Sequence, residues 1–235
     1  MRELVIPTSC TAIDELLGGG LKEGTILLVY GAAGTGKTTL VLQMALNCSG
    51  MGHKALFVDC EGDLRAERIR AISGGEPTAV ENLTIARPRD FEEQSTIIDS
   101  LEQFASAGLA FVAIDTMTGL YRAELSKGVS PFKLNRELNR QAAVMAEVAR
   151  DYGLAVALTS QVRAKIGKPG QEAGEVEPVA NRILRYWADM VICLRHAGQR
   201  GLRMAILEKG PSLSGPGPRA TRFFRITEGG IVDVF

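Results

Sequence analysis

Residues 31–38 read Gly31-Ala32-Ala33-Gly34-Thr35-Gly36-Lys37-Thr38, after an apolar run over 25–30 and before an amphipathic stretch over 39–48. This order predicts a strand, a glycine-rich loop and a helix, and the loop has the GxxxxGK[ST] spacing that binds phosphates. Glycines let the backbone wrap a phosphate closely with its N–H groups pointing inward, and the N-terminus of the next helix favours an anion. The stretch therefore predicts a nucleoside triphosphate site; the alternative is a chance glycine-rich turn.

The loop also predicts which side chains handle the nucleotide. We expect the residues from Gly31 to Thr38, together with Thr39, to surround the phosphates of a nucleoside triphosphate. Lys37 would reach the β and γ phosphates as a point charge and act in catalysis, and the Thr38 hydroxyl would ligate Mg²⁺. A nucleoside triphosphate and Mg²⁺ are therefore expected.

Composition limits the class of protein. A chain of 235 residues with 46% hydrophobic content is typical of one globular domain, and equal numbers of basic and acidic residues exclude an overall basic clamp for nucleic acid. The four cysteines lie far apart, which favours buried thiols in a reducing cytosol over a metal site. Neither a signal sequence nor a membrane-spanning apolar run is visible, so we expect a soluble cytoplasmic protein.

Polar residues follow three apolar stretches, at the strand ends where α/β folds bind ligands. Glu61 follows the stretch 54–59 and would polarise a water aimed at the γ-phosphate; a solvated loop acid is an equal alternative. Asp115 closes the run 109–114 in a Walker B pattern and would hold Mg²⁺ through water or Thr38, unless it only caps the next segment. Gln161 follows 154–159 and would orient the γ-phosphate end, or be a simple strand-end amide.

The remaining pattern predicts an α/β fold. Strands alternate with helices in the first part of the chain and follow one another in the last part, which indicates a mainly parallel sheet flanked by helices, with antiparallel strands at one edge. A short helix near residues 11–17 would be capped by Thr11 or Ser9. The other expected elements are helices over 65–73, 91–104 and 131–152, strands over 83–86, 187–194, 202–207 and 222–226, an edge strand near the end, and irregular segments over 116–130 and 162–178.

Several motifs resemble those of the RecA-type recombinase ATPases of archaea, and most closely of the RadB family of recombinase paralogues. They are Asp59-Cys60-Glu61-Gly62 with Arg65-Ala66-Glu67-Arg68, Tyr121-Arg122-Ala123-Glu124, and Thr159-Ser160-Gln161-Val162. The resemblance covers essentially the whole chain. It implies one RecA-like P-loop ATPase domain with a twisted sheet over residues 1–235, and it implies that the nucleotide is ATP. The recombinases carry a helical DNA-binding domain before this core, and we expect that domain to be missing here.

The resemblance also implies roles for single residues. Glu61, with Lys37 and Gln161, would be catalytic, and Arg68 would lie against the adenine. Tyr121-Arg122-Ala123-Glu124 would begin the first DNA-binding loop, and residues 163–178 would correspond to the second. The expected DNA contacts are Arg122, Arg163, Lys165, Lys168 and Arg182. Tyr186 or Trp187 would stack on a base, although a core position in a strand is the favoured interpretation for Trp187. The basic row Lys133, Arg136 and Arg140 is interpreted as a solvated helix face.

Three departures from the recombinase pattern shape the functional hypothesis. The polymerisation linker is missing, so we expect a monomer or small homo-oligomer and no long filament. Ala180-Asn181 and Tyr186 replace the Gly-Gly and histidine that end the second loop, which would alter the coupling of nucleotide to DNA. Lys209 replaces an acid near the end of the core and, by hypothesis, acts on the ATP site of a neighbouring subunit.

The first hypothesis is a weakly hydrolysing, ATP-binding and DNA-binding accessory protein of homologous recombination and repair. Its partners would be DNA, preferably single-stranded, and the main recombinase or other repair proteins. The alternative is a KaiC-like signalling ATPase of the RecA superfamily that acts on proteins without DNA. A third interpretation is a nucleotide-dependent scaffold that barely hydrolyses ATP.

Overall fold

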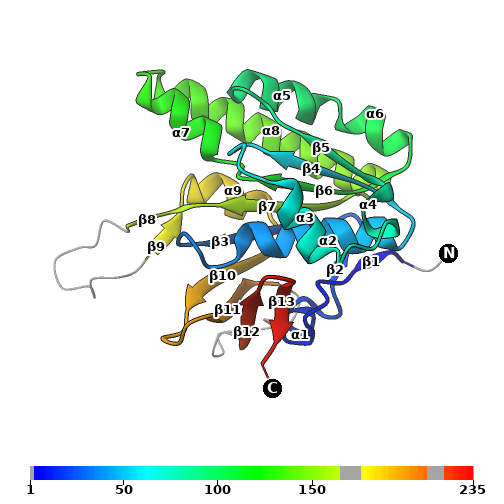
Figure 1. The fold of residues 1–235 in the computed structure, drawn as a ribbon. Helices are drawn as coiled ribbons and strands as arrows, with labels where there is room; N and C mark the ends of the chain where they lie inside the picture. The colour runs from blue at the N-terminus through cyan, green and yellow to red at the C-terminus, as the bar shows by residue number, and fades with distance from the viewer. Residues whose placement is uncertain (1–2, 165–175, 211–219, 235) are drawn as a thin grey trace.

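A nine-stranded sheet forms the centre of the molecule (Figure 1). The computed structural model describes residues 3–164, 176–210 and 220–234. Six neighbouring strands are parallel, in the order β10-β3-β7-β6-β4-β5. Their bounds are β10 Met190–His196, β3 Ile26–Gly31, β7 Ala155–Ser160, β6 Leu109–Asp115, β4 Lys54–Asp59 and β5 Leu83–Ala86.

Three antiparallel strands extend the sheet beyond β10. They are β11 (Leu202–Lys209), β12 (Thr221–Thr227) and β13 (Gly230–Asp233), each paired with the strand before it. The prediction of a mainly parallel α/β sheet with an antiparallel C-terminal extension is therefore confirmed.

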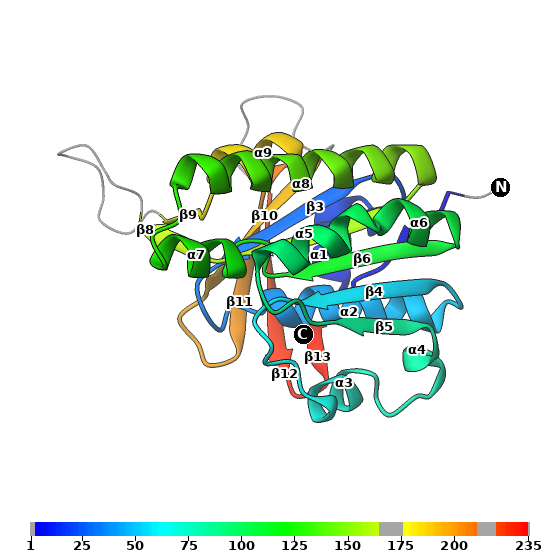
Figure 2. The same cartoon turned by 90° about the horizontal axis from the view of Figure 1, so that it is seen from above.

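Helices cover both faces of the sheet because the central strands are apolar on both sides. Leu27 and Val29 pack with α2 (Lys37–Gly50), whereas Leu28 and Tyr30 belong to the core on the opposite face. That opposite core is covered by α5 (Phe91–Asp99), α6 (Leu101–Ser106), α8 (Pro131–Tyr152) and α9 (Asn181–Trp187). Figure 2 shows α8 lying lengthwise beside α5 and α6.

Shorter elements complete the fold. The strands β1 (Val5–Ile6) and β2 (Leu21–Lys22) form a separate antiparallel pair around α1 (Thr11–Leu17). The helices α3 (Ala66–Ile72) and α4 (Thr78–Glu81) connect β4 to β5. Among the described residues, no helix is long and apolar enough to cross a membrane.

The N-terminal cap of α1 differs from the sequence prediction. Neither Thr11 nor Ser9 caps the helix; the Asp233 carboxylate, from the other end of the chain, accepts the backbone N–H of Thr11 at 3.0 Å and of Ala12 at 2.8 Å. These bonds hold the pKa of Asp233 below its usual value, with the Ala12 N–H as the largest cause. The cap joins both termini, which no local sequence rule can reveal.

Removing this distant cap should destabilise the protein. Asp233→Ala is expected to cost about 1 kcal/mol, as other cap deletions do, and to lower Tm by about 2–4 °C in a chain of this size. Asp233→Asn, which keeps an acceptor oxygen, should cost less. Because the folded-state pKa is lowered, the cap's contribution is complete above the ordinary carboxyl pKa of about 4 and is lost as pH falls through the lowered value. Equal Tm values for wild type and Asp233→Ala at pH 7 would contradict this role.

Two segments expected to be irregular contain regular structure. The connection 116–130 includes α7 (Gly119–Ser126), because Tyr121 is buried edge-on against Phe91 and donates to Asn135 at 2.9 Å. The segment 162–178 begins with β8 (Val162–Ala164) and ends with β9 (Val176–Pro178), which pair with each other. Residues 165–175 lie outside the described part.

Two other expected elements have different boundaries. The helix expected over 91–104 is divided at Ser100, whose hydroxyl donates to the Thr96 carbonyl at 2.9 Å, a back-bond that bends helices. The strand expected from Trp187 begins only at Met190, because Trp187 ends α9. Its indole N–H donates to Asn139 of α8 at 3.0 Å, and its ring contacts Tyr186 edge-on. The expected strand position of Trp187 is therefore wrong.

Candidate nucleotide site at the P-loop

The P-loop connects the end of β3 to the start of α2, as its sequence predicts. Gly36 has φ 101°, which L-residues with side chains rarely adopt, and its added Cβ would lie 2.7 Å from the Ile226 side chain. A Cβ on Gly31 would lie 2.4 Å from the Leu194 carbonyl oxygen. Gly31 is therefore required by its close approach to the backbone of β10, and Gly36 by its left-handed backbone conformation.

Lys37 is buried against the loop that it follows. Its ammonium group donates to the carbonyl oxygens of Gly31 at 2.9 Å and Ala32 at 3.0 Å. Burial lowers its pKa, and the nearby carboxylates of Asp115 and Glu61 oppose that shift. A buried cation held by neutral carbonyls, with no ion-pair partner among the described residues, fits the phosphate-binding task expected of it.

Asp115 and Thr38, the two residues expected to hold Mg²⁺, lie beside each other. Asp115 is almost fully buried at the end of β6 and accepts hydrogen bonds from the hydroxyls of Thr159 and Thr38. Burial is the largest influence on the carboxyl group and raises its pKa, while these bonds oppose the shift. A carboxylate and a hydroxyl beside a P-loop are the hard oxygen donors that Mg²⁺ prefers.

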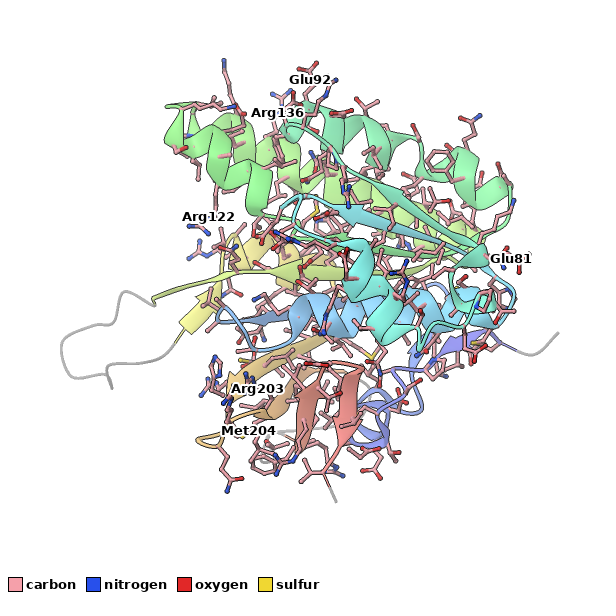
Figure 3. The ribbon with its side chains drawn as sticks, in the orientation of Figure 1. Glu81, Glu92, Arg122, Arg136, Arg203 and Met204 are labelled. Carbon is pink, nitrogen blue, oxygen red and sulfur yellow. The ribbon has the colours of Figure 1, made fainter. Side chains whose placement is uncertain are left out.

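Glu61 and Gln161 meet at the carboxyl ends of β4 and β7. One carboxylate oxygen of Glu61 accepts from the Gln161 amide and from the Thr116 hydroxyl, the latter at 3.3 Å. The amide oxygen of Gln161 in turn accepts from the guanidinium of Arg122, which Figure 3 labels beside α7. The structure thus joins two predicted catalytic residues and one predicted DNA-contact residue into a single hydrogen-bonded chain.

Arg68 lines a cavity of about 510 Å³ next to the P-loop. Its guanidinium donates to the Thr39 hydroxyl at 2.9 Å and to the Glu228 carbonyl at 3.0 Å. The cavity is lined by Thr38, Thr39, Asp63, Leu64, Arg65, Glu67, Arg68, Ala71 and Glu228. Arg68 therefore borders both this cavity and the phosphate loop, in keeping with a place beside the adenine.

Two residues that the sequence patterns do not single out contact the apex of the P-loop. The Nε2 atom of His196 lies 3.1 Å from the Ala33 carbonyl oxygen, and Nε of Arg203 donates to the Gly34 carbonyl at 3.0 Å. Both belong to the hairpin β10–β11, more than 150 positions along the chain from the loop. Only the parallel pairing of Leu194 with Gly31 brings them together.

The predicted DNA-contact residues are only partly placed. Arg122 on α7 and Arg182 on α9 are exposed, whereas Lys165 and Lys168 lie outside the described residues. Arg163 is in β8, where its backbone pairs with Glu177.

The basic row on α8 behaves as the solvated face that was expected. Lys133 and Arg136 are exposed. Arg140 pairs with Asp99 at 2.7 Å and with Glu137 at 2.8 Å, and these carboxylates raise its pKa. The Arg140 guanidinium therefore already forms ion pairs with carboxylates of its own chain.

Lys209 makes its contacts within the chain. Its ammonium donates to the carbonyls of Arg185 at 3.2 Å and of Ala188, at the C-terminal end of α9. The adjacent Glu208 forms an ion pair with Arg185 and accepts from the Tyr30 hydroxyl at 2.8 Å. These bonds fasten α9 to β11, and the role of Lys209 across an interface stays a hypothesis.

Comparisons with known proteins find similar proteins over nearly the whole chain. The family model described as Rad51 matches residues 1–234. The chain is 34% identical over 232 residues to the DNA repair and recombination protein RadB of Archaeoglobus fulgidus, covering 98% of this chain and 99% of that protein. For the RadB protein of Methanobrevibacter smithii the identity is 33% over 231 residues, covering 97% and 95%. A solved structure described as the crystal structure of the RadB recombinase aligns with a TM-score of 0.80 and 33% identity, covering 98% of this chain and all of that one.

Proposed function

Since this chain belongs to the Rad51 family and resembles RadB proteins over nearly its whole length, we propose that it is an ATP-binding, weakly ATP-hydrolysing, DNA-binding accessory protein of homologous recombination and DNA repair. The name of its relatives supports the repair and recombination part. The observation that carries the nucleotide part is the convergence of Lys37, Thr38, Asp115 and Glu61 on one P-loop.

In this proposal the loop's backbone N–H groups and Lys37 bind the phosphates of ATP. Thr38 and Asp115 hold Mg²⁺, which when bound neutralises phosphate charge. The Thr159 hydroxyl fixes the orientation of the Asp115 carboxylate. Arg68 lines the cavity that this proposal assigns to the adenine.

Glu61 would orient and deprotonate the attacking water, with Gln161 aligning the γ-phosphate end. Weak hydrolysis is part of the proposal because a single subunit would lack the group that a neighbour supplies, for which Lys209 is the hypothesis. Gln161 and Thr116 both donate to the same carboxylate oxygen of Glu61 and so orient the group. The second oxygen can still accept a hydrogen bond from the attacking water.

DNA would bind through phosphate contacts from Arg122, Arg182, Arg163, Lys165 and Lys168, which position the nucleic acid without reading its sequence. Single-stranded DNA is the proposed form, and a monomer or small homo-oligomer the proposed assembly. The main recombinase or another repair protein would be the partner. A cytoplasmic location fits the four buried cysteines, all of them free thiols.

Salt-dependent retention of single-stranded DNA tests this function. Replacing Arg163, Lys165 and Lys168 together by alanine should weaken binding at least about tenfold at low salt and flatten its salt dependence, because fewer counterions are released. The matched control replaces Lys133 and Arg136, which are exposed on α8, and should bind like wild type. Wild-type protein that binds no DNA at low salt would overturn the DNA-binding part.

That negative result would favour the KaiC-like alternative, a RecA-superfamily signalling ATPase that acts on protein partners. Two sequence features support this second candidate, namely Lys209 and the entry Gly18-Gly19-Gly20, which resemble that group. Lys209 is bonded to its own α9, so a signalling role across an interface would require those bonds to open.

A further inference from the structure

Several carbonyl groups of the P-loop accept hydrogen bonds from side chains. Lys37 occupies the first two, Gly31 and Ala32. The next two belong to Ala33 and Gly34, at the exposed apex, and they meet His196 and Arg203 at 3.1 Å and 3.0 Å. Four consecutive carbonyls therefore have side-chain partners, and two of those partners, His196 and Arg203, come from the hairpin β10–β11.

The position of this pair of residues follows from strand register. His196 is the last residue of β10 and lies opposite Arg203 of β11, so one rung of the hairpin carries both side chains. Figure 1 shows the hairpin β10–β11 beside the connection from β3 to α2, and Figure 3 labels Arg203 on that hairpin. We call His196 and Arg203 the P-loop clasp.

The hydrogen bonds to the Ala33 and Gly34 carbonyls have a consequence for anion binding. In a phosphate-binding loop the backbone N–H groups must converge on the anion, and a peptide flip would instead point a carbonyl oxygen at it. Gly34, with φ 72°, has no Cβ to restrict its backbone and so can adopt other conformations at little steric cost. Bonds that fix its carbonyl remove that freedom before the ligand arrives, which is preorganisation.

Arg203 is suited to this task because its guanidinium is itself fixed. While Nε donates to Gly34, one terminal nitrogen donates to the Leu202 carbonyl at 2.8 Å. The planar group is therefore anchored to its own strand and presents a rigid donor to the loop. For His196 to donate to Ala33, its Nε2 must carry the proton.

We propose that His196 and Arg203 are positioning residues for the nucleotide, which keep the apex of the P-loop in its phosphate-binding conformation. This inference rests on the proposed nucleotide site and adds two residues that the P-loop motif does not contain. Because the apex cradles the α and β phosphates, the clasp acts on ADP and ATP alike. It does not act on the hydrolytic step at the γ-phosphate.

Binding of ATP and ADP, measured by calorimetry with Mg²⁺, tests the clasp. Arg203→Ala and His196→Ala should each weaken both nucleotides by about fivefold, as expected for one hydrogen bond. At saturating ATP, kcat should stay within about twofold of wild type, so the effect appears in KM. Arg203→Lys should recover part of the loss, since it retains a donor.

The control is Arg200→Ala, which removes an exposed arginine from the turn of the same hairpin and should bind like wild type. Unchanged affinity in the Arg203→Ala and His196→Ala double variant would overturn the clasp, as would a loss confined to ATP. A wild-type protein that binds neither nucleotide would instead reject the proposed function. The two failures are thus distinguishable.

Discussion

Lys37→Ala is expected to reduce ATP affinity by more than about a hundredfold, because it removes the one buried cation of the P-loop. The ammonium group donates to the carbonyls of Gly31 and Ala32. When ATP binds, it needs only to rotate from these carbonyls to the phosphate oxygens. Direct titration with ATP and Mg²⁺ measures the effect.

The matched control for this variant is Lys133→Ala, a change at an exposed lysine of α8 that should leave ATP affinity unchanged. The Lys37→Ala variant should still fold, because burial already disfavours the charged form of that lysine. A melting curve checks this point. If folded Lys37→Ala protein binds ATP within about threefold of wild type, Lys37 is not the phosphate ligand.

Glu61→Gln is expected to keep ATP binding within about twofold while lowering kcat by about a hundredfold or more, the usual size of a general-base effect. An amide keeps the shape of the side chain and still accepts from Gln161 and Thr116, but it cannot accept a proton from water. Single-turnover hydrolysis of bound ATP separates this chemical defect from a defect in binding.

Glu81→Gln provides the control for charge, because Glu81 is an exposed glutamate of α4 that takes no part in the chain from Glu61 to Arg122. It should hydrolyse ATP like wild type. Normal hydrolysis by Glu61→Gln would show that another group activates the water, and the role assigned to Glu61 would then be wrong.

Local patterns were sufficient for the strands of the nine-stranded sheet, apart from the start of β10, and for most helices and the P-loop, but not for β1, β2, β8 and β9. A buried parallel strand is a continuous apolar run, and it ends where a polar residue such as Asp115 follows, so its position can be predicted from neighbouring residues alone. The same rule predicts that Glu61, Asp115 and Gln161 share one edge of the sheet. The structure confirms that they converge: the Gln161 amide donates to Glu61, and Asp59, two residues before Glu61, pairs with Asp115 in the parallel sheet.

The patterns failed where a distant partner stabilises a segment. The helix α7 is short and weakly periodic, and it exists because Tyr121 packs against Phe91 and bonds to Asn135. Tryptophan is common in strands, but Trp187 ends the helix α9, where its indole N–H donates to Asn139 of α8. Propensity is a weak prior, and such tertiary contacts override it.

The sequence by itself determined that this protein has a P-loop, which carboxylates accompany it, and which class of sheet surrounds it. Those features depend on residues that are close together in the chain or on the shared edge of parallel strands. Only the tertiary structure decided that Asp233 caps α1, that Arg122 reaches Glu61 through Gln161, and that His196 and Arg203 hold Ala33 and Gly34. Each of these contacts joins residues that lie tens to hundreds of positions apart, and it depends on strand register and on how the chain folds back on itself. Local periodicity and motif spacing do not predict such contacts.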